Sequence, residues 1–277
     1  MRGVALVQAL VIVAALALVS VALLQRGDTA RLRLEDRFAA DQAGLYLDSG
    51  VDLVRANLPE GVVHLRQDWA TPREGVRIDR GLLGWRIEDL QGRFNLSLLG
   101  ADPQGLRRAM LVRLLRGQGV EEPLANALGA ALVAPITAQS LTALLADPRL
   151  DATLRNRLAA LLIVLPPEAR FNVNTLRAPI LAAMLPGAPA ATLAALSEQI
   201  ASEPVSDLET FVAMARAALG DEAAESLTAL PLNVTSRHFA LQIEARLDSV
   251  ILRRAVVLDT GAGDGRAAIV QSFPEFE

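Results

Sequence analysis

Residues Val4 to Leu24 read VALVQALVIVAALALVSVALL, and this stretch decides the fold. Only Gln8 and Ser20 interrupt its apolar character. In a helix these residues rise about 31 Å, roughly the thickness of the hydrocarbon core of a bilayer. A cleaved secretory signal has a shorter apolar run and a cleavage site of small residues, neither of which is present here. We therefore predict a membrane-spanning helix.

The charges on the two sides of this span bear on its orientation. Arg2 precedes the span, and four arginines follow it closely, namely Arg26, Arg31, Arg33 and Arg37. Because arginine gathers on the cytoplasmic side of a membrane, this count favours a cytoplasmic C-terminal side. The resemblance described below implies the opposite orientation.

The helical pattern continues beyond the span. Apolar residues recur at steps of three, four and seven, at Leu34, Phe38, Leu45, Leu47, Val51, Val54 and Leu58. The first proline is Pro59, so no proline breaks a helix before that point. Two interpretations stay open. One is a membrane anchor followed by a separate amphipathic helix, and the other is a single pilin-type helix whose second half packs a globular head.

Alternating apolar and polar residues predict strands near both ends of the remaining chain. The first runs from Trp85 to Leu90, and the most regular runs from Phe239 to Leu247. Two more are expected at about Val250 to Leu258 and Ala268 to Phe273. The turn Asp248-Ser249 is not a favoured hairpin sequence, so the strand register is left open there.

The stretch between these strands carries helical signals, with prolines separating its segments. Ser206 and Glu209 have the spacing of a capping box, and the helix they begin is expected to end at Gly220. Within residues 171–187, Asn174 or Thr175 can cap a short helix that Pro186-Gly187 closes, which is a helix-hairpin-helix pattern.

Such hairpins often bind the DNA backbone, but the charge here is unsuitable. Residues 168–216 hold five acids and three arginines, which leaves a net charge of −2. A negative segment does not attract phosphates. We expect the hairpin to be a packing module.

The composition contains few of the residue types that enzymes use for catalysis. The chain has 277 residues, a net charge of −4, two histidines and no cysteine. Disulfides and thiolate metal sites are thereby excluded, and neither His64 nor His238 has neighbours at metal-ligand spacing. No Gly-x-Ser-x-Gly nucleophile motif is present. We predict no catalytic residue, no metal site and no enzyme activity, and we expect His238 to be structural.

Four segments, taken in order, resemble the K-type minor pseudopilins of type II secretion, the general secretion pathway protein K (GspK) family. They are Arg2-Gly3 before Val4-Ala-Leu-Val7, Asp89-Leu-Gln-Gly-Arg-Phe-Asn-Leu96, Asn172-Val-Asn-Thr175 and Ser236-Arg-His-Phe-Ala-Leu241. The resemblance spans nearly the whole chain. It implies an α+β, pilin-like fold, with a long N-terminal helix packed on a small antiparallel sheet and a large all-helical insertion domain.

The resemblance also implies a division of the chain. The expected parts are a leader peptide at residues 1–3, the transmembrane part of the N-terminal helix at 4–24, the first part of the pilin-like domain at 25–101, the helix-hairpin-helix-like insertion domain at 102–231 and the C-terminal strands of the pilin-like domain at 232–277.

By this resemblance, prepilin peptidase removes the leader after Gly3, and Val4 becomes the methylated N-terminus. The N-terminus is then cytoplasmic and the head periplasmic, and we give this processing motif precedence over the arginine count. Gln8 stands where pilin-like proteins usually carry a glutamate that pairs with the N-terminal amine of a neighbour. A neutral residue avoids an unpaired charge in an apolar bundle, which fits a tip subunit with no neighbour ahead of it.

The chain departs from the family in one place. The family's insertion usually holds an Asp-Trp-Ile-Asp-x-Asp stretch followed by a glycine-acid-tyrosine run, whereas this chain has Leu132-Val-Ala-Pro-Ile-Thr137. The resemblance would imply calcium, but this departure weighs against it. No cofactor is predicted.

The function predicted from the sequence is that of a non-enzymatic minor pseudopilin at the tip of the type II secretion pseudopilus, in the inner membrane, which initiates assembly and supports protein secretion across the outer membrane. The implied partners are the I-, J- and H-type minor pseudopilins, the major pseudopilin, prepilin peptidase and the inner membrane, but not nucleic acid. Two alternatives stay open, a minor pilin of a type IV pilus and a membrane-tethered DNA-uptake protein that uses the hairpin.

Overall fold

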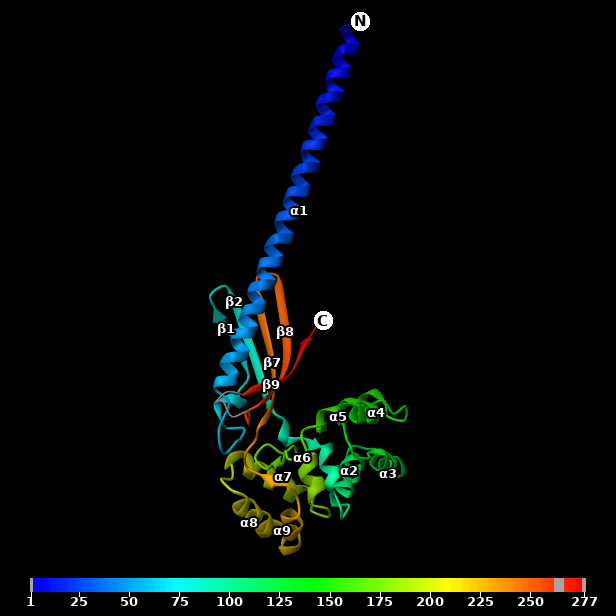
Figure 1. The fold of residues 1–277 in the computed structure, drawn as a ribbon, viewed down its shortest axis with the longest axis vertical. Helices are drawn as coiled ribbons and strands as arrows, with labels where there is room; N and C mark the ends of the chain where they lie inside the picture. The colour runs from blue at the N-terminus through cyan, green and yellow to red at the C-terminus, as the bar shows by residue number, and fades with distance from the viewer. Residues whose placement is uncertain (1, 262–266, 276–277) are drawn as a thin grey trace.

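The computed structural model describes residues 2–261 and 267–275. Within these ranges, the side chains of residues 2–9, 11 and 273–275 are not described. Within these limits the molecule has a projecting N-terminal helix, an antiparallel sheet and a group of helices at the far end of the sheet (Figure 1). The predicted α+β, pilin-like fold class is confirmed.

The N-terminal element is one continuous helix, α1 (Arg2–Ala56). It has no break at Gly27-Asp28, so the interpretation of a single long helix is confirmed over that of two separate helices. Its last part packs on the sheet through a stripe at helical spacing, made of Ala39, Ala43, Leu47, Val51 and Val54.

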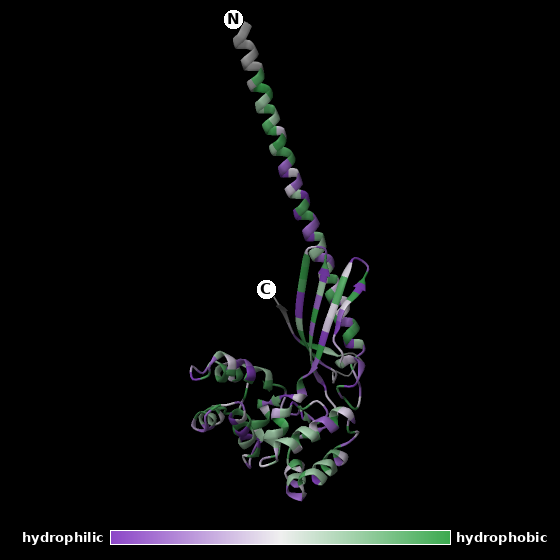
Figure 2. Ribbon diagram, turned by 180° about the vertical axis from the view of Figure 1, so that it is seen from behind, coloured by the Kyte–Doolittle hydropathy of each residue, from purple (hydrophilic) through white to green (hydrophobic). Residues whose placement is uncertain are grey.

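Within the described residues, the first part of α1 packs against no other element. Its described large apolar side chains are exposed, among them Leu10, Val13, Leu16, Leu18 and Leu23. Figure 2 shows this apolar half and a more polar segment next to the sheet. By length and composition, the segment searched, Ile12–Ala56, meets the criteria for a membrane span. Such a surface is stable only in lipid or against other apolar helices.

Within the described residues, the main sheet has the strand order β1-β2-β7-β8-β9, with every neighbouring pair antiparallel. Its strands are β1 (Arg73–Ile78), β2 (Gly81–Asp89), β7 (His238–Leu247), β8 (Val250–Asp259) and β9 (Ala268–Glu275). The last four match strands predicted from the sequence, whereas β1 was not predicted. The sheet therefore joins chain segments from before and after the helical block.

The register at the β7–β8 turn, left open by the sequence, is that of a two-residue hairpin. Leu247 lies opposite Val250, and Asp248 has a φ of 52°. Aspartate tolerates this left-handed conformation better than most residues, so the turn forms without glycine.

One face of the sheet and the buried stripe of α1 enclose the first core. The largest fully buried residue there is Phe239, whose ring lies edge-to-face with Trp69, 5.4 Å between centroids. Trp69 lies on a short 3-10 helix (Asp68–Ala70) between α1 and β1.

The helical block has a separate core. Its helices are α2 (Leu106–Gly117), α3 (Glu122–Ala131), α4 (Ala138–Leu145), α5 (Ala152–Leu161), α6 (Ala178–Met184), α7 (Ala190–Ser202), α8 (Leu208–Leu219) and α9 (Asp221–Thr228). Two short parallel strand pairs, β3 (Phe94–Asn95) with β4 (Leu162–Ile163) and β5 (Phe171–Asn172) with β6 (Leu232–Asn233), connect it internally. The exact domain boundaries given above stay predictions.

Two predicted helix caps are wrong. The N-cap of α8 is Asp207, which accepts a hydrogen bond from the backbone of Thr210, so Ser206 does not cap this helix; Gly220 follows its end as predicted. At α6 the N-cap is Arg177, and neither Asn174 nor Thr175 caps the helix. The reason is that tertiary contacts, described below, use both side chains.

The helical block lies at the end of the sheet opposite the exit of α1 (Figure 1). The exit is marked by the β7–β8 turn, where Ser249 lies 3.3 Å from Asp36 of α1. At the other end β2 stops at Asp89 and β7 begins at His238. The sheet therefore has the exit of α1 at one end and the helical block at the other.

Candidate functional site

The predicted processing and assembly residues lie at the free end of α1. Gly3, Val4 and Gln8 belong to the first turns of α1, and the N-terminal end of this helix lies far from the sheet (Figure 1). Their side chains are outside the described part of the structure. Their roles therefore stay predictions.

Next to the head, α1 presents an exposed apolar stripe. Leu34, Phe38 and Leu45 are all exposed, Phe38 to 70%. With about 100° of rotation per residue, these three side chains share one side of the helix, opposite the buried Ala43 and Leu47. This side is suited to packing against another helix.

The three internal segments that carry the family resemblance meet at one buried carboxylate, that of Asp89. Its Oδ2 accepts hydrogen bonds from Thr175 Oγ1 at 2.5 Å, Ser236 Oγ at 2.6 Å and Asn172 Nδ2 at 2.9 Å. Its Oδ1 accepts one from the backbone N–H of Gln91 at 2.9 Å. We call these five residues the Asp89 junction.

The residues of the Asp89 junction are buried, and their buried side-chain polar atoms have hydrogen-bond partners. Asp89 is 4% exposed, and burial raises the pKa of its carboxyl, while the hydrogen bonds from Ser236, Thr175, Gln91 and Asn172 oppose that rise. Every contact to the carboxylate comes from a donor, so it acts only as an acceptor. This arrangement ties the end of β2 to the helical block and to the chain entering β7.

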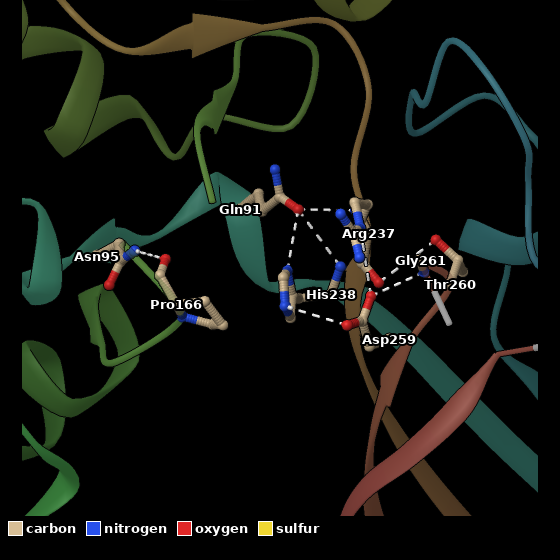
Figure 3. Close-up of polar contacts among 8 residues, drawn as sticks. All are labelled: Gln91, Asn95, Pro166, Arg237, His238, Asp259, Thr260 and Gly261. Atoms are coloured by element: carbon tan, nitrogen blue, oxygen red, sulfur yellow. Dashed lines mark hydrogen bonds and ion pairs between the residues drawn. The ribbon is translucent and has the colours of Figure 1, made fainter. Parts of the chain in front are cut away.

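Gln91 makes a second connection between these parts of the chain, and Figure 3 shows its contacts with Arg237 and His238. Its Oε1 accepts from the backbone N–H groups of Arg237 at 2.7 Å and His238 at 3.3 Å, and its Nε2 donates to the carbonyl of Arg170 at 2.7 Å. Nearby, Asn95 Nδ2 donates to the carbonyl of Pro166 at 3.0 Å. Two side-chain amides thus hold the loop before β5.

His238 lies between Gln91 and Asp259 (Figure 3). Its Nδ1 is 3.3 Å from Gln91 Oε1, and its Nε2 is 3.9 Å from Asp259 Oδ2. Burial lowers the pKa of His238, and the charge of Asp259 opposes this shift. The neutral ring therefore serves packing and hydrogen bonding. Among the described residues no group of three or more His, Asp or Glu side chains could hold a metal ion.

Two further contacts tighten the junction. A Cβ at Gly92 would overlap the carbonyl oxygen of Thr175, so the close approach of these segments requires glycine. Glu88 pairs with both Arg93 and Arg177. Burial raises the pKa of Glu88, but the hydrogen bonds and charges of the two arginines outweigh it and lower the pKa overall.

The comparisons with known proteins point one way. No family model matches the chain. It is 29% identical over 227 residues to "Type II secretion system protein K" of Pseudomonas aeruginosa, an alignment that covers 66% of this chain and 68% of the relative. Its fold matches a chain of the crystal structure of the GspK-GspI-GspJ complex of the enterotoxigenic Escherichia coli type 2 secretion system. That match has a TM-score of 0.67 and 21% identity, and covers 90% of this chain and 99% of the other.

The projecting helix, the antiparallel sheet and the helical block define a pilin-like fold, in which the described residues include one long apolar helix near the N-terminus. The two matches agree with the similarity to minor pseudopilins of the GspK family of type II secretion, and the resemblance seen in the sequence is confirmed.

Replacing Asp89 should weaken the junction. In Asp89→Asn an amide N–H₂ replaces one carboxylate oxygen. At the Oδ1 position the backbone N–H of Gln91 loses its acceptor, and at the Oδ2 position the amide faces the donors Thr175, Ser236 and Asn172. We expect the free energy of unfolding to fall by about 1–3 kcal/mol, because a buried donor is left unsatisfied. Urea denaturation of the full chain in detergent, followed by circular dichroism, measures this. Asp79→Asn, at an exposed position, is the matched control, and equal stability of the two variants would contradict the role given to Asp89.

Proposed function

We propose that the chain is the tip subunit of the type II secretion pseudopilus, where it initiates assembly with other minor pseudopilins and supports secretion without enzyme activity. The observation that carries this proposal is the position of the helical block, at the end of the sheet opposite the exit of α1. A subunit added beyond the head would have to occupy that place, so the block stops growth on that side.

The first part of α1 supports a single-pass location in the inner membrane. We propose that prepilin peptidase cleaves after Gly3 and that Val4 becomes the methylated N-terminus on the cytoplasmic side. The span ends near Leu24, and the first side chain buried against the sheet is Ala39, so about 20 Å of helix separates lipid from head. The head then lies in the periplasm.

We further propose that the exposed stripe at Leu34, Phe38 and Leu45 packs against the helices of neighbouring subunits. The structural relative is a complex of GspK with GspI and GspJ. I-, J- and H-type minor pseudopilins and the major pseudopilin are the partners we propose for this chain. In such a bundle a neutral Gln8 suits the subunit that has no neighbour ahead, because an ionised residue would stay unpaired in an apolar environment.

The processing step is tested by Gly3→Val. We expect the wild-type chain to lose residues 1–3 and the variant to keep them, because a branched side chain replaces the small residue before the cleaved bond. Mass spectrometry of the N-terminal peptide from membranes measures this. Gly27→Val, in the same helix and with open space around its Cα, is the control and should be processed normally. Normal cleavage of Gly3→Val would refute the assignment.

The tip position is tested by labelling. The chain has no cysteine, so Arg157→Cys on the exposed side of α5 gives one site for maleimide gold. In electron micrographs of overproduced pseudopili we expect gold at one end of each fibre. The cysteine-free chain is the control for unspecific label. Gold distributed along the fibres would contradict a tip subunit.

A further inference from the structure

The outer face of the sheet, turned away from α1, has a hollow over Gly84. The register places Gly84 opposite Glu244 of β7, and Glu244 opposite Arg253 of β8. A cavity of about 640 Å³ opens here, with the bulge of β1 at Glu74-Gly75 as one wall. A Cβ at Gly84 would lie 3.2 Å from the carbonyl oxygen of Arg73, so the missing side chain lets the bulge of β1 approach β2 closely beside the hollow.

A row of three residues that runs across the sheet, apolar at both ends, borders the hollow. Leu82 of β2, Arg246 of β7 and Ile251 of β8 are successive neighbours across the sheet. Leu82 is 38% exposed and Ile251 is 50% exposed. Exposed aliphatic side chains beside arginine are typical of protein interfaces, whereas a purely solvated sheet face is polar throughout.

The charge of the hollow is positive in an acidic protein. It is lined by four arginines against two glutamates, which leaves +2 where the whole chain has −4; these residues are Arg73, Arg86, Arg246, Arg253, Glu74 and Glu244. Glu244 is shared between Arg246 and Arg253. Within the described part of the chain, Arg86 makes no ion pair. A guanidinium exposed in this way favours an acidic partner.

The hollow lies in the half of the sheet nearer the exit of α1. Its residues on β7 and β8 lie close to the turn at Ser249, which contacts Asp36. The helical block covers the opposite end (Figure 1). If the chain is a tip subunit, its neighbours lie on the membrane side, beside this half of the sheet.

We infer that this outer face, centred on Gly84 and bordered by Leu82, Arg86, Arg246 and Ile251, docks an acidic surface on the head of a neighbouring minor pseudopilin. The inference rests on the function proposed above and adds a second contact to the helix bundle. The aliphatic row provides apolar burial, and the arginines select a partner by charge.

The test uses the full chain in detergent and the purified I- and J-type minor pseudopilins of the same organism, with dissociation constants measured at low and high salt. Arg86→Glu combined with Arg246→Glu should weaken binding of one partner at least tenfold and flatten its salt dependence. Arg86→Gln, which removes one exposed charge, should weaken binding by about threefold. Arg157→Glu on α5, a charge reversal away from this face, is the matched control and should bind as the wild type does.

The outcomes separate the two proposals. Binding of both partners by the double variant with wild-type affinity and salt dependence would overturn the docking face and leave the proposed function intact. Failure of the wild-type chain to bind either partner would overturn the proposed function, and the inference with it. Circular dichroism of each variant confirms that a loss of binding is not a loss of fold.

Discussion

At the end of β2 the carboxylate of Asp89 is buried with four hydrogen-bond donors that come from three separate segments of the chain. Taking a carboxylate out of water costs several kcal/mol, and here the donors offset that cost only when all three segments are in place. The chain leaves the sheet at Asp89, and Ser236, 147 positions later, lies just before the strand β7 by which it returns. The same contact therefore closes the excursion of the helical block and fixes the block to the end of the sheet.

Because the helical block is fixed at one end of the sheet, the two ends of the head differ. The helix α1 leaves one end of the sheet, and the helical block lies at the other. The helix α1 packs closely on the sheet because Ala39, Ala43 and Gly50 have small side chains or none. A Cβ at Gly50 would overlap Ile243. A head built in this way can join a bundle of helices below it and present a different surface above it.

The elements with local periodicity could be predicted from the sequence. The helix α1 and the strands β2, β7, β8 and β9 repeat apolar residues at helical or strand spacing, which reflects one buried face. The strand β1 could not be predicted, since Arg73–Ile78 is almost wholly exposed and forms by pairing with β2. Asn174 and Thr175 are residue types that often cap helices. Here their side chains instead donate hydrogen bonds to distant partners, Asn174 to the carbonyl of Val205 and Thr175 to Asp89.

The contacts of the Asp89 junction could not be predicted from the sequence either. The sequence marks the segments of Asp89, Asn172 and Ser236 as family signatures, yet contacts across 83 to 147 positions leave no local pattern. The one available signal is that Asn172 lies directly between two buried apolar residues, Phe171 and Val173. A polar residue in that setting needs a buried partner. Which partner it finds is a property of the tertiary fold.

The central claim is that the junction holds the helical block rigidly at the end of the sheet opposite the exit of α1. Because the chain has no cysteine, spin labels at Asp79→Cys in the β1–β2 turn and Arg157→Cys in α5 report on it directly. Pulsed electron paramagnetic resonance on the full chain in lipid measures the distance between the labels. The account predicts a single narrow distance distribution. A broad or multiple distribution would show that the block moves relative to the sheet and would contradict the claim.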